Sequence, residues 1–355
     1  MTPVCLDDYM RLAEARLPAT VAAYLFGGSA DEVTLNANRA AFNALSLMPR
    51  VMRDLRGGET ATKLFGTSLA APLLVAPMGF QRLFHPAGEI ATAQAAAAIG
   101  AGFVLPTLAS TTLEAVAAAG EGAPQWFQLY LQPERAATLR LVRRAEVAGY
   151  RALVLTVDAP INGIRNREMR TGFALPPDVR AVNLDGETPD SPPTGGHPIF
   201  DGLLASAPTW EDLAWLRAST PLPILVKGIL HPDDAAMALD QGADGIIVSN
   251  HGGRTLDTAP AALAALPRVA QRIGRRVPVL LDGGIRRGTD IVKALAQGAS
   301  AVLVGRPIAA ALAVGGAQGA AHALRILIDE FAVAMALCGC RTPREITPEC
   351  LFAAD

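Results

Sequence analysis

Short apolar segments rich in Val, Ile and Leu alternate with helical segments along the chain from residue 70 onward. Eight of these apolar segments lack the polar alternation of a half-exposed strand, which indicates strands buried on both faces, as in a parallel sheet under crossover helices. Helical segments follow nearly all of them, at residues 89–99, 113–119, 135–148, 233–240 and 289–296 among others. The strand segments are PLLVAP, GFVLPT, QWFQLYL, ALVLTVD, PILVKG, GIIVSN, PVLLDGG and AVLVGRP.

This rhythm predicts an α/β fold, namely a closed (β/α)₈ TIM barrel, with an open doubly wound sheet as the alternative. We expect residues 1–355 to form a single domain, in which an N-terminal helical segment (1–69) caps the barrel (70–310) and C-terminal helices (311–355) follow. The long loop after the fourth strand (176–208) is expected to be flexible, because it contains DGETPDSPPTGGHP, which is rich in Pro, Gly, Ser and Asp.

Composition narrows the classes of partner. The formal net charge of −2 predicts no nucleic-acid partner, and no apolar stretch reaches the length of a membrane span. The first 18 residues carry acids and arginines where a secretory signal would need an apolar run, so we expect a short helix there. The cysteines Cys5, Cys338, Cys340 and Cys350 match no zinc or disulfide pattern, which favours packing thiols, no metal and a cytoplasmic location.

Polar and ionisable residues end most of the predicted strands. In a TIM barrel the carboxyl ends of the strands form the active site, so these side chains are expected to meet at one mouth of the barrel. They are Gln128, Tyr130, Thr156, Asp158, Lys227, Ser249 to Arg254, Asp282, Gly305 and Arg306.

Three of these strand ends indicate particular chemistry. In SNHGGR (249–254), His251 can exchange protons near neutral pH and Arg254 can bind a carboxylate, although a loop with a hydrogen-bonded structural histidine is the alternative. Lys227 could form a Schiff base or stabilise a developing anion. The glycine-rich DGGIRRGTD and VGRP segments suit a phosphate site at helix N-termini, or are simply tight turns.

Six motifs in order, FQLY, TVDAP, VKGI, SNHGGR, DGGIRRGTD and VGRP, give the chain a family resemblance. From about Leu6 to the C-terminus it resembles the FMN-dependent α-hydroxy-acid oxidase and dehydrogenase family. The resemblance implies an enzyme that binds FMN, oxidises an (S)-2-hydroxy acid to the 2-keto acid and passes the electrons to oxygen or a quinone-type acceptor. It also implies a homotetramer or homo-octamer.

The resemblance implies six catalytic residues. His251 matches the base, and Asp158 matches the carboxylate that orients it and stabilises its protonated form. Arg254 and Arg165 match the pair that holds the substrate carboxylate. The last two, whose hydroxyls contact the carboxylate and the reacting oxygen, are Tyr24 and Tyr130.

The resemblance also implies the cofactor site. Lys227 matches the cation that stabilises the reduced, anionic flavin, which answers the question left open by the sequence. The other positions expected to bind FMN are Pro77, Met78, Gly79, Gln128, Thr156, Ser249, Asp282, Gly283, Gly284, Arg286, Gly305 and Arg306.

Three positions depart from the family pattern. Pro106 stands where relatives usually have Ser, which removes a hydroxyl near the flavin and leaves a non-catalytic flavin-binding barrel as one alternative; an FMN-dependent isomerase of a phosphorylated metabolite is the other. Leu108 replaces the Trp of glycolate oxidase-like members, so an aromatic or medium aliphatic, mandelate- or lactate-like substrate is expected. Gly79 stands where relatives have Ala or Gly; because several relatives with Gly pass electrons to acceptors other than oxygen, it predicts slow reoxidation by oxygen and faster electron transfer to a quinone.

Overall fold

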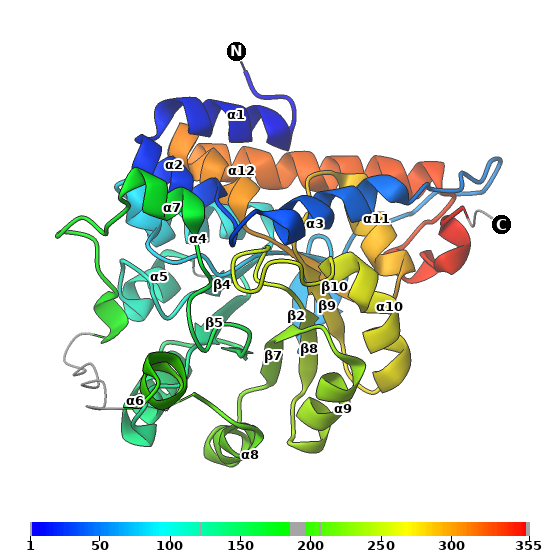
Figure 1. The fold of residues 1–355 in the computed structure, drawn as a ribbon. Coiled ribbons are helices and arrows are strands. Elements are labelled where there is room, and N and C mark those ends of the chain that lie inside the picture. The colour runs from blue at the N-terminus through cyan, green and yellow to red at the C-terminus, as the bar shows by residue number, and fades with distance from the viewer. Residues whose placement is uncertain (1, 121, 185–195, 206, 353–355) are drawn as a thin grey trace.

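The computed structural model describes residues 2–120, 122–184, 196–205 and 207–352, and its centre is a closed barrel of parallel strands (Figure 1). The strands follow one another around the barrel in chain order, and the last pairs with the first. Each predicted apolar segment forms one of them, so the expected TIM barrel is confirmed. The strands are β3 (Leu73–Val75), β4 (Gly102–Leu105), β5 (Gln125–Leu129), β6 (Leu153–Thr156), β7 (Ile224–Ile229), β8 (Gly245–Val248), β9 (Val279–Asp282) and β10 (Ala301–Val304).

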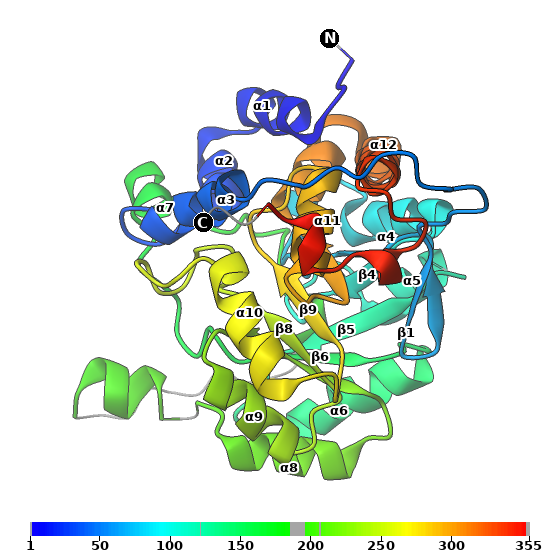
Figure 2. The same ribbon diagram turned by 90° about the vertical axis from the view of Figure 1, so that its right-hand side faces the viewer.

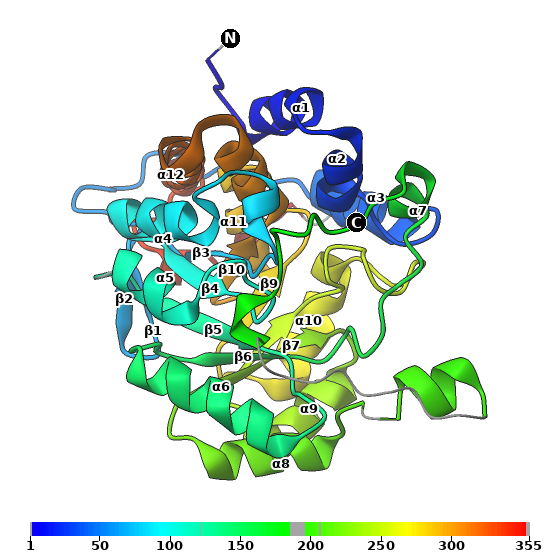
Figure 3. The same ribbon diagram turned by 90° about the vertical axis from the view of Figure 1, so that its left-hand side faces the viewer.

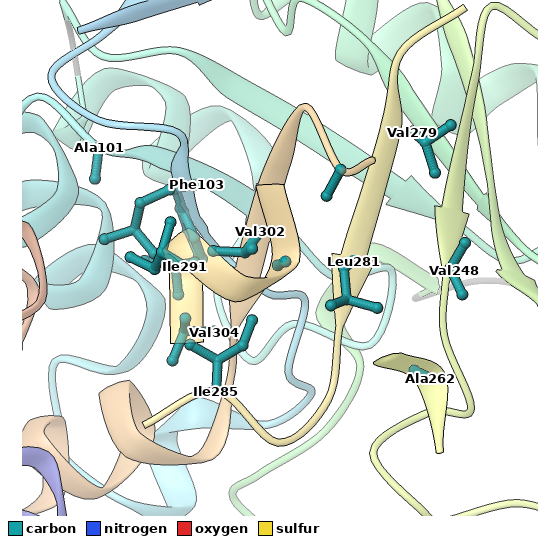
Figure 4. Packing of buried hydrophobic residues seen from close by; sticks show 14 of the residues in the cluster. Ala101, Phe103, Val248, Ala262, Val279, Leu281, Ile285, Ile291, Val302 and Val304 are labelled. Carbon is teal, nitrogen blue, oxygen red and sulfur yellow. The ribbon is translucent and has the colours of Figure 1, made fainter. Parts of the chain in front are cut away.

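Helices surround the barrel because each crossover between parallel strands returns over the outer face of the sheet. Side chains that point outward from β4 and β10, such as Phe103, Val302 and Val304, pack against Ile291 of the neighbouring helix (Figure 4). Side chains that point inward, such as Leu74 and Trp126, form a separate core inside the barrel. The surrounding helices are α4 (Gly88–Ile99), α5 (Leu113–Ala119), α6 (Arg135–Val147), α8 (Trp210–Ser219), α9 (Pro232–Asp240), α10 (Ala262–Ile273) and α11 (Gly288–Ala296).

The N-terminal segment covers the carboxyl ends of the strands. It contains α1 (Leu6–Arg16), α2 (Ala19–Phe26) and α3 (Val33–Ala44), which lie above the barrel in Figure 1. The predicted helical segment 1–69 also contains strands. Two short antiparallel strands, β1 (Thr62–Leu64) and β2 (Thr67–Leu69), form a hairpin whose apolar side chains join the core inside the barrel.

The C-terminal segment begins with the long helix α12 (Arg306–Leu337), which is interrupted by non-helical backbone at Gly315 and Gly316. Leu324, Ile328, Phe331 and Met335 follow one another at helical spacing in α12, and all four are buried in the core. After α12 the chain returns beside α11 (Figure 2), and it brings Cys338, Cys340 and Cys350 into the core as free thiols.

The connection from β6 to β7 is the longest in the barrel. It contains α7 (Asn166–Thr171), a 3₁₀ turn at Val182–Leu184 and a π-helical turn at Pro198–Leu203, and the π-helical turn projects from the barrel (Figure 3). The predicted loop 176–208 therefore contains local structure in its described part. Residues 185–195 and 206, on which much of that prediction falls, lie outside the described residues.

Candidate active site

A cavity of about 730 Å³ opens at the carboxyl ends of the strands. This is the size of a pocket that binds a cofactor and a small substrate. Most of the residues that the sequence predicted for the site line it: Tyr24, Pro77, Met78, Gly79, Gln128, Tyr130, Arg165, Lys227, His251, Arg254, Asp282, Gly283, Gly284, Arg286, Gly305 and Arg306. The other three, Thr156, Asp158 and Ser249, lie buried or half-buried directly behind this wall.

His251 and Asp158 form a hydrogen-bonded pair. His251 Nδ1 lies 2.8 Å from Asp158 Oδ1, and the backbone N–H of His251 donates to Ser249 Oγ at 3.0 Å. His251 has a φ of +56°, and the glycines after it also have positive φ, so the loop turns sharply enough to return the ring over the cavity. Burial acts to raise the pKa of Asp158, but His251 and Lys227 outweigh it and hold the pKa below its ordinary value. The carboxylate is therefore ionised and accepts the Nδ1 proton, which leaves Nε2 as the free ring nitrogen.

Lys227 lies in a buried network that crosses three strands. Its Nζ is 3.1 Å from both Ser249 Oγ and Asp282 Oδ2, and Ser249 Oγ donates to Asp282 Oδ1 at 2.8 Å. Burial lowers the pKa of Lys227, whereas Asp282 and Asp158 raise it by more, so the pKa lies above its ordinary value. The ammonium group is therefore a permanent cation at the cavity wall.

Arg254 and Arg165 both contact the carboxylate of Glu168, a residue that was not predicted from the sequence to lie in the site. Arg254 Nη2 donates to Glu168 Oε1 at 3.0 Å, and Arg165 Nη1 lies 3.5 Å from the same oxygen. Arg254 Nη1 also donates to the carbonyls of Tyr24 (2.6 Å) and Gly27 (3.0 Å), so α2 fixes this guanidinium. A signal was present in the sequence, since Glu168 follows Arg165 by three positions, which is one helical turn.

Two tyrosines complete this end of the cavity. The ring of Tyr24 stacks on Phe173 at 4.8 Å between centroids and faces the Arg254 guanidinium at 5.0 Å. Burial raises the pKa of Tyr24, and it raises that of Tyr130 to about 12, so both groups keep their phenol protons.

The end of the cavity formed by Arg286 and Arg306 is cationic, and Arg306 Nη2 donates at 2.9 Å to the same Gly27 carbonyl that accepts from Arg254 Nη1. Burial lowers the pKa of Arg286 to about 10 and that of Arg306 to about 9. Within the part of the chain that the structure describes, neither guanidinium has a carboxylate at ion-pair distance; Arg286 donates to the Ile285 carbonyl, and Arg306 donates to three backbone carbonyls. Gly283 and Gly284 have φ of +100° and +85°, which exposes backbone at the same end. This end suits a phosphate group.

The residues around the cavity fit FMN. Among the described residues, the buried atoms without a hydrogen-bond partner include Gln128 Nε2, Thr156 Oγ1 and Arg165 Nε, all in or directly behind the cavity wall. A flavin ring with polar edges can bind the first two, and the Lys227 cation suits its anionic reduced form. Pro106 lines the cavity at the end of β4, and the adjacent Thr107 hydroxyl is already bonded to the backbone of Gln128 and Tyr130. The Thr107 hydroxyl is therefore not free to replace the serine hydroxyl that relatives have at position 106.

No group of three or more candidate metal ligands occurs among the described residues, and none of their helices is long and apolar enough to cross a membrane.

Comparison with known proteins identifies the family of this chain. The family described as FMN-dependent dehydrogenase matches residues 13–353. The L-lactate oxidase of Alicycliphilus denitrificans is 51% identical over 97% of this chain and 95% of its own length. The 4-hydroxymandelate oxidase of Amycolatopsis orientalis is 47% identical over 96% of each chain. A crystal structure of mandelate oxidase with (S)-2-phenylpropionate superposes with a TM-score of 0.90 and 44% identity, and it covers 99% of this chain and 98% of its own.

The matches extend over nearly the whole chain, and they support neither an isomerase nor a non-catalytic barrel. The chain therefore belongs to the FMN-dependent dehydrogenase family and is an oxidoreductase that uses FMN to oxidise 2-hydroxy acids.

Proposed function

We propose that this enzyme oxidises the (S)-enantiomer of a 2-hydroxy acid with an aromatic or medium-sized aliphatic side chain to the 2-keto acid. The observation that carries the proposal is that the His251–Asp158 pair opens onto the same cavity as Arg254 and Arg165. A 2-hydroxy acid needs both a base and a cationic site for its carboxylate. FMN, when bound, accepts the two electrons that the substrate loses.

The arginines bind the substrate carboxylate in this proposal. Arg254 donates three hydrogen bonds to described residues, and a guanidinium has five N–H donors, so two remain for a ligand. Arg165 Nε is buried without a partner among the described residues. A guanidinium that binds both carboxylate oxygens fixes the orientation of the substrate.

His251 removes a proton from the bound substrate through Nε2. Its Nδ1 is held by Asp158, whose carboxylate stabilises the imidazolium after proton transfer. Tyr24 and Tyr130 keep their phenol protons, so their hydroxyls donate to substrate oxygens without adding a charge.

Apolar side chains support the expected substrate side chain. Phe80, Leu108, Phe173 and Leu175 line the cavity, and Leu108 leaves more room than the Trp expected in glycolate oxidase-like proteins. Anaerobic reduction of the bound flavin by glycolate, (S)-lactate, (S)-2-hydroxy-4-methylpentanoate and (S)-mandelate tests this. The larger acids should reduce it faster than glycolate, and Leu108→Trp should reverse the order. Fastest reduction by glycolate in the native enzyme contradicts the assignment.

Oxygen is the proposed electron acceptor, because the similar proteins named above are oxidases. Gly79, in contrast, predicts a slow reaction with oxygen and a faster one with a quinone. A Cβ at Gly79 would lie 3.5 Å from the Tyr24 hydroxyl and 3.3 Å from the Leu108 carbonyl, so a methyl group there would crowd the substrate end of the cavity. Stopped-flow reoxidation in air-saturated buffer, compared with a quinone analogue, decides between the two acceptors in native enzyme and Gly79→Ala.

A homotetramer or homo-octamer in the cytoplasm completes the proposal. Two neighbouring segments, joined by a hydrogen bond from the Arg50 N–H to the Leu337 carbonyl, carry exposed apolar side chains. These include Val51, Met52 and Val333, and such a cluster favours association. Light scattering gives the oligomer size. The buried free thiols suit a reducing compartment, whereas one similar protein, from rice, is named as peroxisomal, so imaging of the tagged protein tests the location.

A further inference from the structure

Glu168 brings a negative charge into the end of the cavity where the substrate carboxylate is proposed to bind. It lies on α7, and its side chain lines the cavity. Its side chain and that of Arg254 are each 14% exposed, and that of Arg165 is 18% exposed, so water screens the three charges only partly.

The carboxylate of Glu168 offsets the repulsion between the two guanidinium groups. Burial, and then the neighbouring Arg165, lower the pKa of Arg254, which indicates that the two positive charges destabilise each other. Glu168 Oε1 lies 3.0 Å from Arg254 Nη2 and 3.5 Å from Arg165 Nη1, so one oxygen bridges both groups. With Glu168 ionised, the three side chains carry a net charge of about +1. Arg306, which shares the Gly27 carbonyl with Arg254, is left out of this sum because its charge is assigned to the phosphate of bound FMN.

A net charge of +1 matches a ligand with one carboxylate. A second carboxylate on the ligand would leave an uncompensated negative charge among apolar side chains such as Phe80 and Leu108, which is costly. We propose that Glu168 is a positioning residue that holds Arg165 and Arg254 in place and restricts the site to monocarboxylates. This inference rests on the proposed function of the two arginines.

The test uses the FMN-loaded enzyme and two pairs of nearly isosteric acids. The first pair, 4-methylpentanoate and succinate, lacks the 2-hydroxyl group, so its binding is measured from the flavin absorbance without turnover. The second pair, (S)-2-hydroxy-4-methylpentanoate and (S)-malate, gives kcat and KM. In each pair an isopropyl group at the end of the first acid is replaced by a carboxylate in the second.

The preference is the affinity for the monocarboxylate divided by the affinity for the matched dicarboxylate. We expect Glu168→Gln to lower this ratio roughly tenfold or more, because a single charge acts strongly across a partly buried site. The kcat for the monocarboxylate should fall, since the arginines lose their shared anchor, while its KM should not rise, since the site becomes more positive. Glu168→Asp, which keeps the charge, should retain most of the preference. A purely structural role would instead weaken the binding of both acids equally.

Glu32→Gln is the matched control. Glu32 belongs to the N-terminal segment and accepts hydrogen bonds from Arg167 of α7 at 2.6 Å and from the Gly28 N–H at 2.9 Å. None of its hydrogen bonds within the described residues is to Arg165 or Arg254. This variant should keep the native preference. An unchanged preference in Glu168→Gln overturns the role of Glu168 alone. If no 2-hydroxy acid reduces the native flavin, the proposed function itself fails.

Discussion

The ring of His251 is fixed by Asp158 across the mouth of the barrel, at 2.8 Å between Nδ1 and Oδ1. The two residues are 93 positions apart in the chain and come from the loop after β8 and the end of β6. Gly228 makes the approach possible, because a Cβ at that position would lie 2.5 Å from the Asp158 Cβ. The pair thus depends on close packing of backbone as well as on complementary charge.

Replacement of His251 should separate proton transfer from cofactor binding. We expect His251→Ala to retain FMN and to reduce the rate of flavin reduction by about 10²–10⁴-fold, the usual contribution of a positioned base. Anaerobic stopped-flow absorbance with a 2-hydroxy acid measures the rate, and the flavin spectrum confirms loading. Near-native reduction in this variant would remove His251 from the proposed role.

Tyr130 should act as a neutral hydroxyl over the whole working pH range. Burial raises its pKa to about 12, so its phenol stays protonated to a higher pH than that of an ordinary tyrosine. Its contribution to folding stability is present below its ordinary pKa of about 10 and is lost as the pH rises through about 12. Tyr130→Phe should therefore slow flavin reduction by the same factor at every pH between about 6 and 9. A factor that changes with pH in this range argues for an ionising Tyr130.

Arg286 and Arg306 should differ in how far their loss affects the fold. Arg306 donates to the carbonyls of Leu25, Gly27 and Gly252 at 2.8–3.1 Å, whereas Arg286 donates only to the adjacent Ile285 carbonyl among the described residues. Both alanine variants should bind FMN more weakly. Only Arg306→Ala should also lower the unfolding temperature of the apoprotein clearly. Flavin fluorescence titration and thermal unfolding measure the two effects, and equal apoprotein stability of the two variants contradicts the distinction.

Glu89 should stabilise the loops after β3 and β4. This fully buried carboxylate accepts hydrogen bonds from the backbone N–H groups of Gln81 and Ser110 and from the hydroxyls of Ser110 and Thr111. Glu89→Gln places an amide donor against these donors and should cost about 1–3 kcal/mol of unfolding free energy. Denaturant unfolding measures the loss. The exposed Glu114, paired with Arg144, gives the control Glu114→Gln, which should change stability by less than about 1 kcal/mol.

The barrel could be predicted from the sequence because strands buried on both faces leave unbroken apolar segments. The β1–β2 hairpin could not, since each strand has three residues and alternates exposed and buried positions over too short a length. For the same reason the predicted N-terminal helical segment 1–69 included the residues of this hairpin. The interruption of α12 at Gly315 and Gly316 was not predicted either.

The residue types in the site could be predicted, but their partners could not. Lys227 has no acidic residue near it in the sequence, yet Asp282 lies 3.1 Å away because β7, β8 and β9 are neighbours in the barrel. Arg306 was predicted as a phosphate ligand only, and its bonds to carbonyls of α2 and the following turn depend on how the N-terminal segment folds over the barrel. Contacts between distant segments follow from the closed fold and leave no local pattern.

The hydrogen bond from Arg254 to the Tyr24 carbonyl joins residues 230 positions apart, and Arg306 reaches Leu25 across 281 positions. During synthesis on the ribosome, α2 therefore gains these partners only after most of the barrel has emerged. The cavity wall cannot gain its contact with Arg254 before Arg254 has left the exit tunnel, and it cannot be complete before Arg306 has done so. Before that point a nascent chain can contain many of the barrel strands and still lack a complete site for the flavin. We therefore expect FMN to bind only at the last stage of synthesis or to the finished chain.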